Sequence, residues 1–404
     1  MSVFIPSTSR PRLFGRVAGV TTAAVLTGAA LSGCSPQPPT AQASSTSECE
    51  VPGGFVLAQA VHENAVRNVD DPTVSCYLKA AIGTDAPLWV MGLDGTPTYT
   101  VADEHIGWDP GGANAEAEFN AARAALQQVV GDLGADAHGN RLDLGLNKFG
   151  EAAARAGGQA TVVVASPGTA DGPVVDLTPA AVGATDPEEF AGAVLDTGAI
   201  ASLEGVHIVW VGLGQAAGTQ QVLSQPQLEN LQAIWAAIIE GAGGAVEFVP
   251  GDIVGETVDA GSYTVRPVEP MQLTGPAPQT GTTVAYDDTS AFGFAPDTTA
   301  FRDQPAAETA AGEIARWIAP GDRRIELVGT TAAVGDEQSR RELSQRRAQA
   351  VAELIVAQGG DRSRITATGL GSEFPDYVED RHPDGSLDPV AAVHNRSVRV
   401  TYLG

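Results

Sequence analysis

Five short apolar runs, separated by segments with helical periodicity, constrain the fold of this chain most. The runs are Gly54–Ala60, Leu88–Leu93, Ala160–Ala165, Val206–Leu213 and Ala245–Val249. Apolar residues recur at three- and four-residue spacing in Ala113–Leu133, Leu142–Ala156 and Gln225–Glu240. Strands without polar alternation are typical of a sheet that helices cover on both faces. Residues 49–252 are therefore predicted to form an open, mostly parallel α/β domain.

The pattern changes after residue 252. Residues 253–286 are rich in Pro, Gly and Thr, which predicts a linker that holds one short edge strand at Ser262–Val268. Residues 287–404 predict a second folded domain. Its expected strands are Phe292–Ala295, Arg324–Val328, Arg364–Thr368 and Ser397–Tyr402, and its expected helices are Asp303–Ala319 and Glu337–Gln358. This order predicts an α/β sandwich in which two helices cover one mixed four-stranded sheet.

The second predicted helix of this region is long and has a defined end. Leu343, Arg347, Ala350 and Leu354 are spaced to share one of its faces. Gly359-Gly360 ends it in the usual manner of a helix C-terminus.

The charge of the chain excludes two classes of partner. The formal net charge is −26 over 404 residues. Binding a nucleic acid requires a basic face, so we expect no nucleic-acid partner. An acidic chain is also repelled by anionic lipid, and any membrane attachment must therefore be covalent or hydrophobic.

The N-terminal segment predicts such an attachment. Arg10, Arg12 and Arg16 precede a 15-residue apolar run, Val17–Leu31, which has the length of a secretory signal rather than of a membrane span. The run ends in Leu31-Ser32-Gly33-Cys34 and closely resembles bacterial lipoprotein signal peptides. The resemblance implies removal of residues 1–33, diacylglycerol on the Cys34 sulfur, and a new N-terminus that is either acylated, for example with palmitate, or left free. The alternative is an ordinary signal peptide with a coincidental cysteine.

Export has two further consequences. Residues 34–48 hold the lipidated cysteine and a Ser-, Pro- and Thr-rich stretch that predicts a flexible tether. Cys49 and Cys76 remain as an even pair, which outside the cytoplasm can form a disulfide; the alternative is two buried thiols. We therefore expect a lipid-anchored protein on the extracytoplasmic face of a cell membrane.

The last region carries a series of short motifs. They are Val328-Gly329-Thr330-Thr331, Leu343-Ser344-x-x-Arg347-Ala348-x-x-Val351, Arg364-Ile365-x-x-x-Gly369-x-Gly371, Pro375 and Asn395-Arg396-x-Val398. In order and spacing, over about 115 residues, they resemble the OmpA-like domain of peptidoglycan-associated lipoproteins and flagellar stator proteins.

The resemblance implies that this domain binds peptidoglycan without covalent bonds, through the diaminopimelate side chain of the stem peptide. In the family an aspartate takes the ammonium of this zwitterion and an arginine takes its carboxylate. Arg347 falls on the arginine position, whereas Ala332 stands in place of the aspartate. Thr330 and Arg340 replace the family's histidine and asparagine. The candidate ligand-binding residues are Arg347, Thr331, Leu343, Asn395 and Arg396. A structural role for Arg347, with its head paired to a nearby carboxylate, remains the alternative.

The first domain offers weaker signals. It resembles Rossmann-like and von Willebrand A-like domains, and Asp94, Thr96 and Thr98 fit an Asp-x-Thr-x-Thr pattern that would bind Mg²⁺ or Ca²⁺. A simple turn explains the same residues, because Gly95 and Pro97 lie between them. Val211-Gly212-Leu213-Gly214 is only half of a dinucleotide fingerprint. We find no catalytic constellation, expect no cofactor and predict no enzyme.

Together these features predict a non-enzymatic envelope lipoprotein that links the membrane to the cell wall. Two alternatives stay open. In one, the OmpA-like domain has lost its affinity for peptidoglycan and the lipoprotein binds a protein or another ligand. In the other, the first domain is a metal-dependent enzyme.

Overall fold

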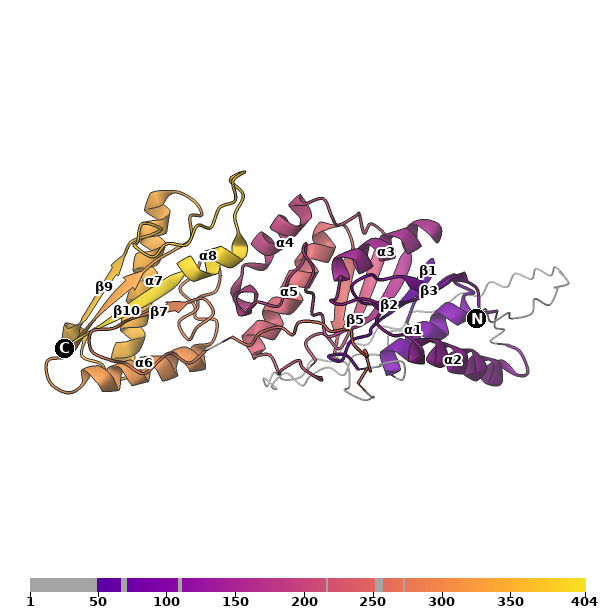
Figure 1. Ribbon diagram of the computed structural model, residues 1–404, viewed down its shortest axis with the longest axis horizontal. Coiled ribbons are helices and arrows are strands. Elements are labelled where there is room, and N and C mark those ends of the chain that lie inside the picture. Colours follow the sequence, from indigo (N-terminus) through magenta and orange to yellow (C-terminus); the bar gives the residue numbers. More distant parts are fainter. Residues whose placement is uncertain (1–48, 67–70, 108–110, 216, 251–256, 272) are drawn as a thin grey trace, which may run out of the picture. The chain divides into compact units, whose positions relative to one another are not determined.

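The structure is a computed structural model that describes residues 49–66, 71–107, 111–215, 217–250, 257–271 and 273–404 (Figure 1). The predicted signal peptide, the predicted lipidation site Cys34 and the predicted tether fall outside these residues. Glu48–Gly404 forms one compact unit, and this unit contains two β-sheets.

The first sheet has six strands in the order β3-β2-β1-β4-β5-β6. They are β1 Gly54–Ala60, β2 Leu88–Leu93, β3 Tyr99–Glu104, β4 Ala160–Ala165, β5 Val206–Val211 and β6 Ala245–Val249. All neighbouring strands are parallel except β3, which is antiparallel to β2 and forms one edge. The predicted open, mostly parallel sheet is confirmed.

Helices cover both faces of this sheet, which is why its central strands are apolar throughout. On one face lie α1 (Pro72–Gly83) and α2 (Ala115–Gly131), and on the other α3 (Leu142–Arg155), α4 (Pro187–Asp196) and α5 (Gln225–Gly241), as Figure 1 shows for α1, α2 and α3. A short 3₁₀-helix, η1 (Ala180–Ala184), precedes α4.

The sequence starts α4 in a standard way. Asp186 caps the helix by accepting hydrogen bonds from the backbone N–H groups of Glu188 and Glu189, at 2.9 and 3.1 Å. Pro187 occupies the first turn, where a missing N–H costs nothing. This cap fixes the direction in which Glu189 leaves the helix.

The predicted disulfide is confirmed. Cys49 and Cys76 are bonded, with their Cα atoms 5.9 Å apart. The bond joins the residues just before β1 to the middle of α1 and so ties a surface helix to the first central strand.

The second sheet has four strands in the order β7-β10-β8-β9. They are β7 Thr283–Asp287, β8 Arg324–Gly329, β9 Ile365–Gly369 and β10 Ser397–Leu403. The central strand β10 is antiparallel to β7 and to β8, while β8 and β9 are parallel. Helices α6 (Gln304–Ile318) and α7 (Glu337–Ala357) pack on this sheet around a shared core. The predicted mixed four-stranded sheet with two helices is confirmed, and the structure adds α8 (Pro389–Asn395) and the 3₁₀-helix η2 (Arg362–Arg364).

Two predicted strands are wrong. Ser262–Val268 forms no strand, because its N–H groups bind side chains instead of a neighbouring strand: Val268 donates to Gln220 and Arg266 to Asp171. Phe292–Ala295 is a loop that inserts its aromatic rings into the core, with a single bridge between Phe294 and Phe301. The sheet position expected for it belongs to β7, which begins within the predicted linker.

The buried face of α7 also differs from the predicted one. Apart from Arg347, the residues that the helix buries are Ser344, Ala348, Val351, Ala352 and Ile355. Leu343, Ala350 and Leu354 lie half-buried beside them. The core-facing stripe is therefore rotated by about one residue, which places the Arg347 side chain at its edge.

Within the described part of the chain, we find no helix with the length and apolar character needed to span a bilayer.

Candidate functional site

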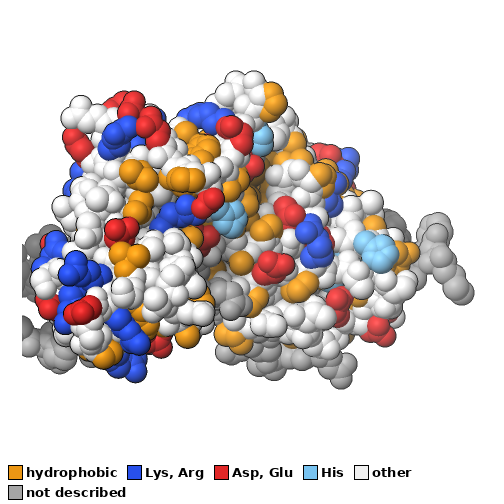
Figure 2. All heavy atoms as spheres, turned by 60° about the vertical axis from the view of Figure 1, so that its left-hand side comes forward, with side chains coloured by type: hydrophobic (Ala, Val, Ile, Leu, Met, Phe, Trp, Pro, Cys, Tyr) orange, Lys and Arg blue, Asp and Glu red, His pale blue; other side chains and the backbone are white. Residues whose placement is uncertain are grey.

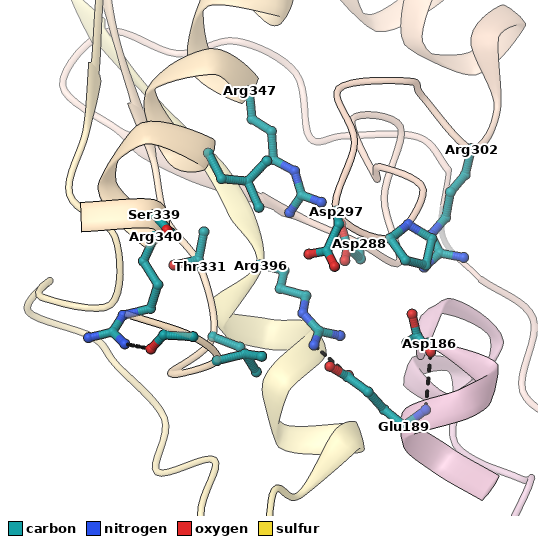
Figure 3. Close-up of a pocket in the computed structure, with 15 residues that line it drawn as sticks. Asp186, Glu189, Asp288, Asp297, Arg302, Thr331, Ser339, Arg340, Arg347 and Arg396 are labelled. Atoms are coloured by element: carbon teal, nitrogen blue, oxygen red, sulfur yellow. Dashed lines mark hydrogen bonds and ion pairs between the residues drawn. The ribbon is translucent and has the colours of Figure 1, made fainter. Parts of the chain in front are cut away.

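A cavity of about 210 Å³ lies at the end of the four-stranded sheet where β8 runs into α7. This volume is below that of a pocket for a drug-sized ligand and suits a small polar group. Its walls come from the loop after β7, the β8–α7 loop, α7, the residue after α8, and α4 (Figure 3). The lining residues are Asp186, Glu189, Asp288, Pro296, Asp297, Arg302, Thr331, Ala332, Val334, Gly335, Ser339, Arg340, Leu343, Arg347 and Arg396.

Arg347 projects from α7 into this cavity, toward Asp288 and Asp297 (Figure 3). Arg347 is only 3% exposed to solvent. Its Nε donates to the carbonyl oxygen of Thr298 at 3.0 Å and its Nη2 to that of Ala295 at 3.3 Å. The guanidinium also lies 5.0 Å from the centre of the Phe294 ring. Burial lowers the pKa of Arg347 from its usual value, against the attraction of the Asp288 carboxylate. The side chain is therefore fixed in place before any ligand binds.

The position of Arg347 depends on two glycines beneath α7. A Cβ atom on Gly329 would lie 2.0 Å from the carbonyl oxygen of Ser344, and one on Gly369 would lie 2.3 Å from the nitrogen of Gln345. The helix backbone thus rests directly on the ends of β8 and β9. The Ser344 hydroxyl also accepts the N–H of Gly371 at 3.0 Å. These contacts anchor α7 one turn before Arg347.

Three further arginines, Arg302, Arg340 and Arg396, line the cavity. Arg396, the first residue after α8, donates from Nη2 to Oε2 of Glu189 on α4 at 2.5 Å. Burial alone would lower the pKa of Arg396, but the Glu189 carboxylate outweighs it and the pKa is raised. Arg302 donates from Nη2 to the carbonyl oxygen of Ala184 at 2.7 Å.

Asp288 lies between these arginines, immediately after β7. The residue is 2% exposed, and one carboxylate oxygen accepts the N–H of Phe294 at 3.1 Å. Burial raises the pKa of Asp288, although the charges of Arg347, Arg302 and Arg396 act in the opposite direction. With three guanidinium groups around one enclosed carboxylate, this part of the cavity favours an anionic ligand group.

Thr331 carries a buried hydroxyl that has no hydrogen-bond partner among the described residues. The residue is 4% exposed and lines the cavity. Beside it, Ala332 presents only a methyl group. A buried polar atom without a partner costs free energy, and a ligand in the cavity would remove that cost.

The structure brings together four of the five predicted ligand-binding residues: Arg347, Thr331, Leu343 and Arg396 all line the cavity. Asn395 does not line it. Its amide exchanges hydrogen bonds with the backbone of Val378 and donates to Asp380, so it supports the loop before α8.

Other cavity residues were missed by sequence reasoning. Asp288 could have been suspected from its place directly after a strand. Glu189 carries no local signal, because it lies 207 residues from Arg396 in the chain.

Of the weak metal candidates in the first domain, Asp94 binds backbone groups of its own chain. The Asp94 carboxylate accepts the backbone N–H groups of Thr96, Asp136 and Ala137 at 2.7 to 3.1 Å. The residues after Asp94 lead into the edge strand β3 rather than into a helix. In the described part of the chain no three His, Cys, Asp or Glu residues are grouped to hold a metal ion. Asp94 therefore braces two loops.

The surface around the four-stranded sheet is not uniformly acidic, despite the net charge of −26. Figure 2 shows Lys and Arg side chains intermixed with Asp and Glu side chains on this face. Local pairs such as Arg341–Glu373 and Arg399–Asp376, at 2.6 and 2.9 Å, account for part of this mixture.

Comparison with known proteins finds relatives of the C-terminal part of the chain. A family model described as the OmpA family matches residues 293–384. Among solved structures, the peptidoglycan-associated lipoprotein from Burkholderia pseudomallei is 23% identical, with 29% of this chain and 88% of that chain covered and a TM-score of 0.24. The cell wall anchor of the T6SS from Pseudomonas aeruginosa is also 23% identical, with 29% and 78% covered and a TM-score of 0.23.

One curated protein matches a short stretch. Over 80 residues the chain is 32% identical to Photosystem I P700 chlorophyll a apoprotein A2 of Gloeobacter violaceus. The match covers 20% of this chain and only 9% of that protein.

The family match includes Thr331 and Arg347, and it covers the β8–α7 segment that forms much of the cavity. Residues 293–384 of this chain are an OmpA family domain.

Proposed function

We propose that this protein binds peptidoglycan without covalent bonds, by taking the side-chain end of a diaminopimelate residue of the stem peptide into the cavity beside Arg347. The observation that carries the proposal is the combination of a fixed, buried arginine and an unpartnered Thr331 hydroxyl in one small cavity of an OmpA family domain.

The chemistry of the ligand suits this cavity. The free end of diaminopimelate carries a carboxylate and an ammonium on one carbon atom. A guanidinium can bind the carboxylate through parallel N–H donors, and the enclosed surroundings strengthen that attraction. Thr331 can add a hydrogen bond to the same group. A lysine in the stem peptide lacks the side-chain carboxylate, so the arginine would discriminate between the two peptides.

We further propose that the chain is a lipoprotein anchored to a membrane through Cys34, as its N-terminal residues suggest. The tether would then let the OmpA family domain reach the wall, and the protein would link membrane and wall without catalysing a reaction. Mass spectrometry of the mature N-terminus should find an acylated Cys34. A Cys34→Ala chain should be released from the membrane or remain uncleaved; continued retention of a cleaved Cys34→Ala chain would contradict the anchor.

The experiment for peptidoglycan binding is co-sedimentation of the purified full-length chain, in mild detergent, with diaminopimelate-type sacculi. Thr331→Val removes only the unpartnered hydroxyl and should leave folding intact. Loss of one hydrogen bond of about 0.5–1.5 kcal/mol should weaken binding by roughly two- to twelvefold. Arg347→Lys keeps the charge but loses the fork of donors, and should weaken binding by about tenfold or more.

The control is Thr366→Val, the same change at an exposed residue of β9, which should bind as the wild type does. Failure of the wild type to sediment would contradict the proposal. It would favour the alternative in which the domain is a docking module without affinity for peptidoglycan. The uncharged Ala332 in the cavity lining is the observation that supports this alternative.

A further inference from the structure

Helix α4 packs on the layer that covers the six-stranded sheet, and it also forms part of the cavity wall. Asp186 and Glu189 of this helix line the same cavity as Arg347 and Arg396. Figure 3 shows the α4 residues and the arginines on facing sides of the cavity. The family match covers neither α4 residue, since it begins at residue 293.

A packed contact holds α4 in this place. Ala181 and Ala184 of η1, just before α4, form a small buried cluster with Met271 and with Val393 of α8. Arg302 adds its hydrogen bond to the carbonyl oxygen of Ala184. The Glu189–Arg396 pair is therefore one part of a larger contact, and its side chains are 26% and 14% exposed.

The charges in the cavity are distributed unequally. The segments from Asp288 to Arg396 supply all four arginines of the lining, Arg302, Arg340, Arg347 and Arg396, but only two carboxylates, Asp288 and Asp297. The carboxylate deepest in the cavity, Asp288, is enclosed by Arg302, Arg347 and Arg396. At the β8–α7 loop Ala332 offers no charge. Glu189 of α4 and the helix cap Asp186 bring the lining to four carboxylates against four arginines, and these two lie on the side of the cavity away from Arg347, where they can take the ammonium of a zwitterionic ligand (Figure 3).

The contact with Arg396 leaves Glu189 with a spare acceptor. Only Oε2 is bound to Arg396, and Oε1 has no hydrogen-bond partner among the described residues. The unpartnered Thr331 hydroxyl in the same cavity is an independent sign that a ligand group belongs there. A ligand ammonium beside Glu189 would give Oε1 a partner, while the ligand carboxylate would accept the Thr331 hydroxyl.

We infer that the binding site is composite: Glu189, assisted by Asp186, supplies the acidic half that takes the ammonium of the stem-peptide side chain, while Arg347 takes its carboxylate. This inference rests on the proposed binding of peptidoglycan. It adds that the α4 side of the molecule determines specificity for a ligand with a free amine.

The test is calorimetric titration of the full-length chain with two soluble muropeptides, one with a free amine on the diaminopimelate side chain and one with that amine acetylated. Glu189→Gln keeps the shape and an acceptor for Arg396 but loses the charge. It should weaken binding of the free-amine peptide by about tenfold and leave binding of the acetylated peptide within about twofold of wild type.

Two further variants make the result decisive. Asp186→Asn preserves the helix cap, since Asn caps as well as Asp, and should weaken free-amine binding in the same direction. Glu188→Gln, an exposed neighbour outside this cavity, is the matched control and should bind as wild type. Circular dichroism of each variant checks that it is folded.

Opposite outcomes overturn the inference. Tighter binding by Glu189→Gln would mean that Glu189 blocks Arg396 and competes with the ligand. Equal binding by Glu189→Gln and Glu188→Gln would mean that α4 takes no part. In both cases wild-type binding that falls in Thr331→Val would leave the proposed function intact, whereas absence of any wild-type binding would remove the proposed function itself.

Discussion

Gly329→Ala tests whether the contact between α7 and the end of β8 sets the geometry of the site. The added Cβ atom would lie 2.0 Å from the carbonyl oxygen of Ser344, about 1.4 Å closer than the 3.4 Å at which ordinary contacts begin. The obstacle is backbone, so no side chain can rotate away. Overpacking of this kind costs about 1–3 kcal/mol, and we expect the upper end of that range.

Gly312→Ala is the matched control within the same domain. Gly312 lies inside α6, where an added Cβ atom would meet only Oε1 of Gln358 at 3.9 Å. Alanine should stabilise this helix by about 0.5–1 kcal/mol, because glycine is costly in a helix interior. Urea unfolding followed by circular dichroism measures both variants on the full-length chain.

The two changes should therefore move the free energy of unfolding in opposite directions. Gly329→Ala should also weaken muropeptide binding, since α7 must lift away from β8 and carry Arg347 with it. A Gly329→Ala chain as stable as Gly312→Ala would refute the direct packing of the helix backbone on the strand.

Three other predictions concern groups outside the cavity. His394 Nδ1 donates to Oδ2 of Asp287 at 3.0 Å. This hydrogen bond raises the pKa of His394 and lowers that of Asp287 against the effect of burial. A raised histidine pKa contributes its full stability below the unfolded-state pKa of 6.5, and this contribution is lost as the pH rises through the folded-state pKa. His394→Ala should therefore lower the free energy of unfolding more at pH of about 6 than at pH of about 9. Equal decreases at the two pH values in urea unfolding would contradict this. Reducing the Cys49–Cys76 bond should lower the free energy of unfolding by about 3.5 kcal/mol in the loop-entropy model for its 27-residue separation, and unchanged urea midpoints with and without reductant would contradict it. Asp94→Ala leaves three backbone N–H groups without their acceptor and should cost about 2–4 kcal/mol, whether or not Mg²⁺ is present; stabilisation of the wild type alone by Mg²⁺ would revive the metal site.

The strands that sequence reasoning found are those whose pattern has a single explanation. β1, β4 and β5 are apolar at every or nearly every position because helices cover both faces of the sheet. The edge strand β3 was missed, since it is mostly exposed and ends in charged residues. The first strand of the second sheet was placed at Phe292–Ala295, because buried aromatic rings in a loop look like a strand when no partner is known.

The site divides in the same way. Arg347 and Thr331 belong to motifs whose spacing reflects one strand–helix unit, and such local units can be recognised in a sequence. Asn395 belongs to a motif as well, yet its amide is used to hold a loop. Glu189 reaches the cavity because η1 packs against α8. No residue pattern near Glu189 predicts this tertiary contact.

The most direct measurement is calorimetric titration of the full-length chain with a muropeptide that contains diaminopimelate and with its lysine counterpart. We expect the diaminopimelate peptide to bind at least about tenfold more tightly, because only it offers a carboxylate to Arg347, and we expect Arg347→Lys to remove most of that difference. Equal affinity of the wild type for both peptides, or no heat of binding with either, would contradict recognition of the stem peptide by this cavity.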